Sequence, residues 1–237
     1  MKLKVIVPIA TSKFNEGVAR EVRAVLAPDA DFDLENISEG TKSIESRYDE
    51  FCNAPGIVRL AVQAQQDGFD AIFVDCFGEP SVDTVRELIQ IPVLGGFTPA
   101  ILMAKAISQR YSIVTMLPNV IPLLIDLERK AAIETEVVSN RAVDIPVEQL
   151  DDHQKLLEAL FTQSQLAIQE GAQAIILGCT GMLGVAGELQ NLLAAKKMPV
   201  PVIDPTPCAI TMLEALVRVK LSHSKLAYYP VSPEEET

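Results

Sequence analysis

The stretch that decides the fold of this chain is Ala174-Ile-Ile-Leu-Gly-Cys-Thr-Gly-Met-Leu-Gly184. Its apolar residues end at Gly178, the thiol of Cys179 follows, and a turn of small residues leads into a helical pattern. This order is typical of a buried parallel strand that carries Cys179 at its carboxyl end. Ligands bind at that edge of open α/β sheets, where the turn into the next helix also leaves backbone N–H groups unpaired. We therefore expect Cys179 to face a ligand-binding crevice.

A second strand of the same kind lies far upstream. Asp70-Ala-Ile-Phe-Val-Asp-Cys76 is followed by the turn Phe77-Gly-Glu-Pro80 and by another helical pattern. Two thiols, each placed between a strand and a helix, indicate two halves of the chain that face each other across one ligand.

Strands and helices alternate along the rest of the chain. Apolar runs and period-two patterns predict strands at residues 3–9, 32–37, 69–76, 92–95, 110–115, 134–138, 174–177 and 200–203. Helical spacing predicts helices at 15–26, from Pro55, from Pro80, at 99–108, from Pro118, and at 147–169, 185–195 and 208–219, with a loop over 38–53. Such alternation predicts parallel sheets with helices on both faces, which is an α/β fold.

The composition is that of an ordinary globular protein. The 237 residues are 49% apolar and carry a formal net charge of −12. Nucleic acid is not an expected partner, because affinity for it comes mostly from Lys and Arg. No segment has the length and apolarity of a signal sequence or a membrane span, so we expect a cytoplasmic chain without a membrane partner. Its four cysteines are then expected to be thiols.

Signatures of metal and nucleotide sites are missing from the sequence. His153 and His223 are isolated, and H-E-x-x-H and C-x-x-C do not occur. The glycine-rich phosphate motifs are absent as well. We therefore expect no metal and no cofactor, with His153 solvated on a helix and His223 on the surface.

Cys76 and Cys179 are the candidate catalytic residues. Two opposed thiols suit proton transfer at a carbon acid, because one thiolate can remove a proton from one face while the other thiol delivers a proton to the opposite face. We expect the N-terminus of the following helix to lower the pKa of each thiol. Side chains alternate along a strand, so we expect Asp75 to point away from Cys76. The amides that follow each cysteine are candidates to stabilise the enolate-like charge.

The remaining polar candidates have simpler interpretations. Cys52 is interpreted as packing in a loop or helix start, and Cys208 as packing in a first helical turn. Thr115 is expected at the end of its strand, where its hydroxyl either bonds a ligand or caps the next helix.

Several of these segments together resemble the aspartate/glutamate racemase superfamily, and within it the hydantoin racemase branch. The resemblance rests on Leu177-Gly-Cys-Thr-Gly-Met182, on Asp75-Cys-Phe-Gly-Glu-Pro80, and on residues 92–95, 112–115 and 201–205. It extends from the first strand to the tail at residues 222–225. The motif around Cys179, with a strand-end cysteine upstream, is specific for the superfamily and much less specific for the substrate.

The resemblance implies two Rossmann-like α/β/α domains related by a pseudo-twofold axis, with the active site in the cleft between them. Residues 1–96 with 207–237 would form the first domain, and residues 97–206 the second. It also implies a cofactor-independent, two-base mechanism in which Cys76 and Cys179 are the catalytic thiols. Relatives commonly assemble, so we expect a homo-oligomer.

Substrate-binding positions are implied by the same resemblance. Thr115 matches a strand-end threonine near the substrate. Phe77, Gly78, Thr180 and Gly181 match turn residues whose backbone amides hold substrate oxygens.

Two stretches depart from the family pattern. Residues 7–11 replace an Asn-Pro-Asn turn, and residues 95–98 replace a Gly-x-Gly-Glu stretch. Both are expected to border the ligand, which adds Ile9 and Gly96 to the substrate-binding residues. Their lack of polar groups favours a substrate with a neutral or apolar side chain.

The leading hypothesis is a racemase of a 5-substituted hydantoin or a similar cyclic ureide. An aspartate or glutamate racemase is the nearest alternative, and a maleate-type isomerase a more distant one. No Arg or Lys stands next to the thiol turns to bind a second carboxylate. A third alternative is a non-catalytic small-molecule binding protein in which the thiols serve packing or redox roles.

Overall fold

The computed structural model describes residues 1–231, which form two four-stranded sheets. The first sheet contains β1 (Lys2–Val7), β2 (Asp31–Asn36), β3 (Ala71–Val74) and β4 (Val93–Leu94). The second contains β5 (Tyr111–Thr115), β6 (Val137–Ala142), β7 (Ala174–Leu177) and β8 (Val202–Ile203). All strand pairs in both sheets are parallel. The α/β class predicted from the alternating pattern is therefore confirmed.

The two sheets share one strand order. They run β2-β1-β3-β4 and β6-β5-β7-β8, as expected for two halves related by a pseudo-twofold axis. In each sheet the order reverses between the two central strands, β1 and β3 or β5 and β7. A crevice lies outside the carboxyl ends of the strands at such a switch point.

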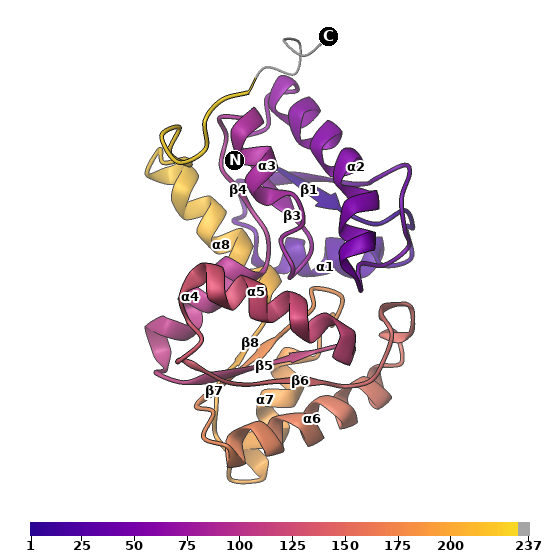
Figure 1. Cartoon of the computed structure of the whole chain (residues 1–237), viewed down its shortest axis with the longest axis vertical. Helices are drawn as coiled ribbons and strands as arrows, with labels where there is room; N and C mark the ends of the chain where they lie inside the picture. The colour runs from indigo at the N-terminus through magenta and orange to yellow at the C-terminus, as the bar shows by residue number, and fades with distance from the viewer. Residues whose placement is uncertain (232–237) are drawn as a thin grey trace.

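Helices flank both sheets. They are α1 (Asn15–Val25), α2 (Arg47–Gln66), α3 (Val82–Leu88), α4 (Phe97–Ile107), α5 (Ile121–Ala131), α6 (His153–Gln169), α7 (Ala186–Ala195) and α8 (Pro205–Arg218), with short 3-10 turns η1 (Pro118–Val120) and η2 (Val147–Gln149). Figure 1 shows the sheets in separate lobes, with α4 and α5 near the boundary. α8 follows the second sheet but packs on α1, α4 and β3, so the chain returns to the first lobe. The domain boundaries expected from the family resemblance stay a prediction.

Local sequence explains the main elements. The central strands β3 and β7 are buried along their whole length, as apolar parallel strands covered on both faces must be. α1 buries Val18 and Val22 on one face. Side chains at the N-caps of α2, α6 and α8 each accept a backbone N–H of the first turn; they belong to Ser46, Asp152 and Asp204.

Several predicted boundaries are wrong. α2 begins at Arg47 rather than at Pro55, because Ser46 caps it, and Pro55 lies inside the helix. α3 begins at Val82 rather than at Pro80, because Glu79 and Ser81 adopt positive φ angles of 54° and 60°. β6 occupies residues 137–142 instead of 134–138, and the predicted helix 147–169 is divided into η2 and α6. α8 begins at Pro205, before the predicted start at residue 208.

Within residues 1–231, no helix combines the length and the apolarity needed to cross a membrane. Large apolar side chains are exposed on α4 and in the tail, among them Leu102, Ile107, Leu221 and Leu226. The homo-oligomer expected from the family resemblance stays a prediction.

Candidate active site

A small cavity lies where the carboxyl ends of the four central strands converge. Its wall is formed by residues that follow β1, β3, β5 and β7, and by parts of α1, η2 and the loop before α2. The lining residues are Val7, Pro8, Ile9, Phe14, Val18, Ile44, Asp75, Cys76, Met116, Val147, Cys179, Thr180 and Gly181. The cavity therefore sits at the switch points of both sheets, where ligands bind in open α/β folds. Its volume is about 50 Å³.

Cys76 and Cys179 both line this cavity as free thiols. Each is the second residue after the third strand of its half, because β3 ends at Val74 and β7 at Leu177. The Gly181 N–H donates to the sulfur of Cys179 over 3.3 Å. The backbone amide of Gly78 lowers the pKa of Cys76, as the amide of Gly181 does for Cys179.

Burial raises the pKa of both thiols. For Cys76, burial acts first and the nearby thiol of Cys179 second. For Cys179, burial raises the pKa to about 12 against the opposing effect of the Gly181 and Met182 amides. The expected lowering by a helix N-terminus is wrong, because α3 and α7 begin only several residues after the cysteines. In the closed cavity both thiols are neutral.

Other predicted site residues are divided between the cavity wall and the packing behind it. Ile9, Thr180 and Gly181 line the cavity. Phe77 is buried and packs edge-on against Phe97, with ring centroids 5.5 Å apart.

Gly96 and Thr115 also lie behind the wall, whereas Gly78 lines a separate hollow next to Glu50 and Glu79. Gly96 donates its N–H to the carbonyl of Cys76 over 3.0 Å. A Cβ at Gly96 would lie 3.0 Å from a Pro205 side-chain atom and 3.1 Å from the Phe77 backbone, so glycine permits this close packing. The Thr115 hydroxyl donates to the carbonyl of Gly178 over 3.2 Å and is fully buried. The structure therefore does not bring Thr115 to the cavity surface.

Asp75 lines the cavity between the two halves, although strand alternation predicted that it points away from Cys76. The prediction is wrong because β3 ends at Val74, so the alternation no longer applies to residues 75 and 76. Only 7% of Asp75 is exposed. Burial is the main cause that raises the pKa of its carboxyl to about 7, and the charge of Asp204 adds to it.

Two further carboxyl groups lie behind Asp75. Glu21 of α1 accepts the Gly184 N–H over 2.6 Å, and burial together with Asp204 and Asp75 raises its pKa to about 8. Asp204 accepts the Thr206 N–H over 3.1 Å, and burial raises its pKa to about 6. Three acidic groups from distant parts of the chain therefore meet beside the thiols. Among residues 1–231, no group of His, Cys, Asp and Glu side chains is suited to hold a metal ion.

A family model described as Asp/Glu/Hydantoin racemase matches residues 3–213, which is most of the chain. The chain belongs to this racemase family. It is 33% identical to a hydantoin racemase of Paenarthrobacter aurescens, over 100% of this chain and 99% of the relative. The resemblance to the hydantoin racemase branch is thus confirmed, and it supports racemase activity, which is an isomerase activity.

Solved structures of the racemase family share the whole fold. An allantoin racemase from Klebsiella pneumoniae has a TM-score of 0.91 and 31% identity, with 100% of this chain and 96% of that chain covered. An allantoin racemase from Pseudomonas fluorescens has a TM-score of 0.92 and 30% identity, with both chains covered completely. The two-lobed arrangement of Figure 1 is therefore shared with racemases along its full length.

In this racemase-family chain, contacts across the cleft hold the lobes together. The carboxylate of Glu45 accepts the Val147 N–H over 2.8 Å. Arg47 and Asp126 form an ion pair with an N–O distance of 2.7 Å. Because ligand pockets usually measure roughly 300–1,000 Å³, the small cavity corresponds to a closed cleft that must widen to admit a substrate.

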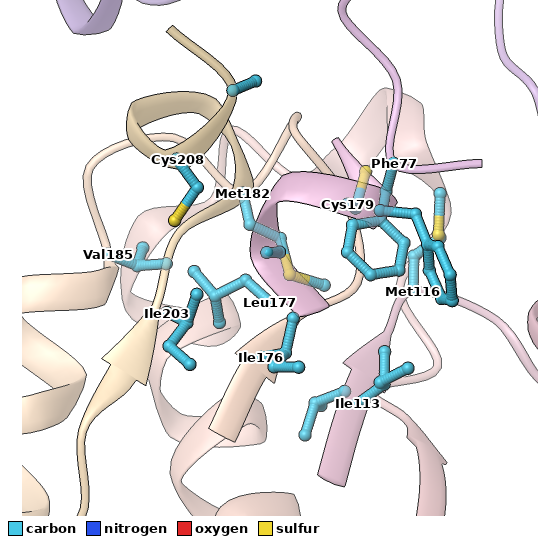
Figure 2. Close-up of a cluster of buried hydrophobic side chains, with 14 of the residues drawn as sticks. Phe77, Ile113, Met116, Ile176, Leu177, Cys179, Met182, Val185, Ile203 and Cys208 are labelled. Atoms are coloured by element: carbon cyan, nitrogen blue, oxygen red, sulfur yellow. The ribbon is translucent and has the colours of Figure 1, made fainter. Parts of the chain in front are cut away.

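The other two cysteines do not line the cavity. In Figure 2, Cys179 lies beyond the end of the strand that carries Ile176 and Leu177. Cys208 lies on a separate helix, and Met182 is drawn between the two cysteines. Cys208 is buried in the first turns of α8, and Cys52 lies inside α2 rather than in a loop. His153 pairs with Glu188 on the surface, whereas His223 is half-buried against the carbonyl of Ile89.

Proposed function

We propose that this protein racemises a 5-substituted hydantoin or a similar cyclic ureide by two-base proton transfer between Cys76 and Cys179, without a cofactor. The observation that supports it most is the matched position of the two thiols in one cavity, each two residues after the third strand of its half. Family membership supports racemisation as the reaction class.

The chemistry follows from two thiols in different protonation states. A thiolate forms when one cysteine releases its proton to water in the open cleft. This thiolate takes the proton at C5 of the bound substrate, and the electron pair of the broken C–H bond moves into the adjacent carbonyl as an enolate. The opposite thiol then gives its proton to the other face of C5. One thiolate and one thiol remain, with their roles exchanged, so no proton is gained or lost.

Turn amides are suited to stabilise the enolate. The Gly181 N–H donates to the sulfur of Cys179, and the backbone amide of Gly78 lowers the pKa of Cys76, so both amides favour thiolate character. Preorganised N–H donors stabilise developing negative charge most in a dry site. Closing the cleft over the substrate removes water and strengthens these interactions.

A neutral substrate fits the wall better than an amino acid does. Most of the lining side chains are apolar, including Ile9, Ile44, Met116 and Val147, and none of the lining residues is a Lys, Arg or His. A carboxylate that lies against such a wall loses its hydration without gaining an ion pair, which costs several kcal/mol. An uncharged ring with an apolar 5-substituent avoids this cost.

Polarimetry of both pure enantiomers tests the proposal. Each enantiomer of a hydantoin with an apolar 5-substituent is incubated with the protein, next to allantoin, aspartate and glutamate. We expect loss of optical rotation for both hydantoin enantiomers and no change for the two amino acids. The Cys52→Ser variant is a matched control, because its thiol is outside the cavity and activity should persist. Racemisation of aspartate or glutamate, but not of any hydantoin, would favour the amino-acid racemase.

A second measurement distinguishes a racemase from a non-catalytic binding protein. Iodoacetamide alkylation of Cys76 and Cys179 is followed by mass spectrometry with and without the hydantoin. A racemase should show protection by the hydantoin together with loss of rotation. Protection without any loss of rotation would favour the binding protein.

A further inference from the structure

The two halves differ at one position beside the thiols. Asp75 precedes Cys76, and the corresponding residue before Cys179 is Gly178. A side chain at Gly178 would collide with its own sheet, since its Cβ would lie 2.8 Å from an Ile113 side-chain atom. The first half instead carries a carboxyl group at this position, on the cavity wall. Asp75 therefore breaks the symmetry of an otherwise matched pair of turns.

The carboxyl of Asp75 has an unused hydrogen-bonding atom. Asp75 is 93% buried, since 7% of it is exposed, and its Oδ1 is buried without a partner within the described chain. The Thr180 hydroxyl donates over 3.2 Å to the backbone carbonyl of Asp75 and so joins this residue to the turn of the opposite thiol. Buried polar atoms are nearly always satisfied, so the unpaired oxygen of this cavity-lining residue points to a ligand as its partner once the cleft widens.

The groups around Asp75 are acidic, with no cation among those that act on it. Asp204 before α8 acts directly on its carboxyl, Glu21 of α1 lies in the same cluster, and Cys76 and Cys179 face it across the cavity. Glu50 and Glu45 act on the two thiols. Burial raises the pKa of Asp75 to about 7, against the opposing effect of the Thr180 hydroxyl, and the charge of Asp204 adds to the rise. The carboxyl is therefore largely protonated below neutral pH and becomes charged above it.

We propose that Asp75 is a specificity-determining residue of the cavity, which meets the substrate as a neutral carboxyl group and selects an uncharged amide or ureide over a carboxylate. This inference rests on the proposed function and names the substrate group that the site recognises. A protonated carboxyl offers one O–H donor and one C=O acceptor side by side. A cis-amide edge of a cyclic ureide presents the complementary C=O and N–H.

Rejection of anions follows from the same group. A substrate carboxylate would meet two further acids behind Asp75, namely Glu21 and Asp204, with no cation to balance them. Once Asp75 ionises, two like charges within a few ångströms repel each other. Selection against carboxylates should therefore strengthen as the pH rises through 7.

Two alkylating reagents of similar size and different charge test this inference without any substrate. Iodoacetamide is a neutral amide and iodoacetate a carboxylate, and both react with thiolates. Mass spectrometry measures the rate at which each reagent alkylates Cys76 and Cys179. The iodoacetamide rate divided by the iodoacetate rate at the same cysteine does not depend on the fraction of thiolate. In the wild type we expect this ratio to rise roughly tenfold between pH 6 and pH 8.5, which corresponds to a repulsion of about 1.4 kcal/mol. In Asp75→Asn the rise should be clearly smaller, about threefold or less, because only Glu21 and Asp204, which lie behind residue 75, still ionise over that range.

Asp204→Asn provides a second variant. Asn is also a good N-cap, so α8 should be retained, and loss of the Asp204 charge should shift the rise in the ratio to lower pH. A ratio that rises equally in the wild type and in Asp75→Asn would overturn the inference. A flat ratio in the wild type would overturn it as well. Thermal melting of each variant confirms that it is folded before it is scored.

Racemisation adds a separate arm. The kcat/KM of Asp75→Asn for the hydantoin is divided by that of the wild type. This quotient should increase as the pH rises through 7, because residue 75 becomes charged only in the wild type. A quotient that is independent of pH contradicts the role of Asp75 in substrate selection. If neither protein racemises any hydantoin, the proposed function fails, and the alkylation ratio still decides whether Asp75 discriminates by charge.

Discussion

Cys76 and Cys179 occupy equivalent positions in two sheets of the same strand order. Each follows the third strand of its sheet by two residues, and the backbone amide of a glycine two residues farther along lowers the pKa of each thiol. Both line a cavity at the switch points of the sheets. The repeated architecture therefore places one thiol from each half on the wall of the same cavity.

Replacement of either thiol should stop racemisation. In Cys76→Ser and Cys179→Ser, kcat should fall by roughly 10³-fold or more, because one of two proton-transfer groups is lost. Each variant should still exchange the C5 proton of one enantiomer with solvent, and the two variants should differ in which enantiomer that is. Proton NMR in heavy water follows the exchange. Cys208→Ser serves as the control, and normal racemisation by either active-site variant would contradict the mechanism.

The turn after Cys76 depends on the half-buried carboxyl group of Glu79. Glu79 has a φ of 54° and accepts both the N–H and the hydroxyl of Thr98, over 2.9 and 2.8 Å. These bonds join the first thiol turn to the start of α4. Glu79→Ala should lower kcat by about tenfold or more with a smaller change in KM, because misplaced reacting groups slow the chemical step. Glu87→Ala, on the exposed surface of α3, is the control. Equal kinetics of the two variants would refute this role.

Stability should depend on pH through Glu21. Its pKa is raised to about 8 in the folded protein from 4.5, so its contribution to stability is full below pH 4.5 and is lost as the pH rises through 8. Gln cannot ionise but can still accept the Gly184 N–H. Glu21→Gln should therefore match the wild type near pH 4.5 and exceed it at pH 8.5 by on the order of 2 kcal/mol, or roughly 4–8 °C in Tm.

Thermal melts at the two pH values check this, with Glu16→Gln on the exposed face of α1 as the control. A Tm difference between Glu21→Gln and the wild type that does not change with pH would show that the carboxyl ionises normally.

The loop before α2 should act as part of the closure of the cleft. Glu45 holds the N–H of Val147 over 2.8 Å, and the neighbouring Ile44 and Val147 line the cavity. Loss of this hydrogen bond should favour the open cleft, so Glu45→Ala should be alkylated by iodoacetamide roughly three- to tenfold faster at Cys179. Glu39→Ala, exposed in the same loop, should react like the wild type. Unchanged alkylation of Glu45→Ala would mean that this contact does not limit access.

Much of the fold was predictable because the strands are short, apolar and regularly separated by helical patterns. The strand before Cys179 could be recognised from four apolar residues and a glycine, and the structure places β7 on the same residues. Pro55 indicates a helix start, whereas Ser46 and Asp49, which have the spacing of a capping pair, begin α2 at Arg47. Pro80 misled in the same way, since the positive φ angles of Glu79 and Ser81 delay α3.

The acidic groups of the site were not predictable from local sequence. Glu21, Asp75 and Asp204 come from three distant segments and meet only through tertiary packing. The direction of Asp75 depended on where β3 ends, and strand ends are poorly defined by sequence patterns. At both thiols, burial raises the pKa more than the local amides lower it. Burial is a property of the closed cleft rather than of any motif.

The isotope content of the product in the first turnovers in heavy water decides whether two thiols share the proton transfer. Each pure hydantoin enantiomer is incubated with the protein in heavy water, and early samples are separated on a chiral column and analysed by mass spectrometry. We expect deuterium at C5 in the product enantiomer from the start, while the recovered substrate keeps its hydrogen, because the donor thiol has exchanged with solvent. A product that retains the substrate's own hydrogen would contradict the claim, because a single base would then have returned that hydrogen to the opposite face.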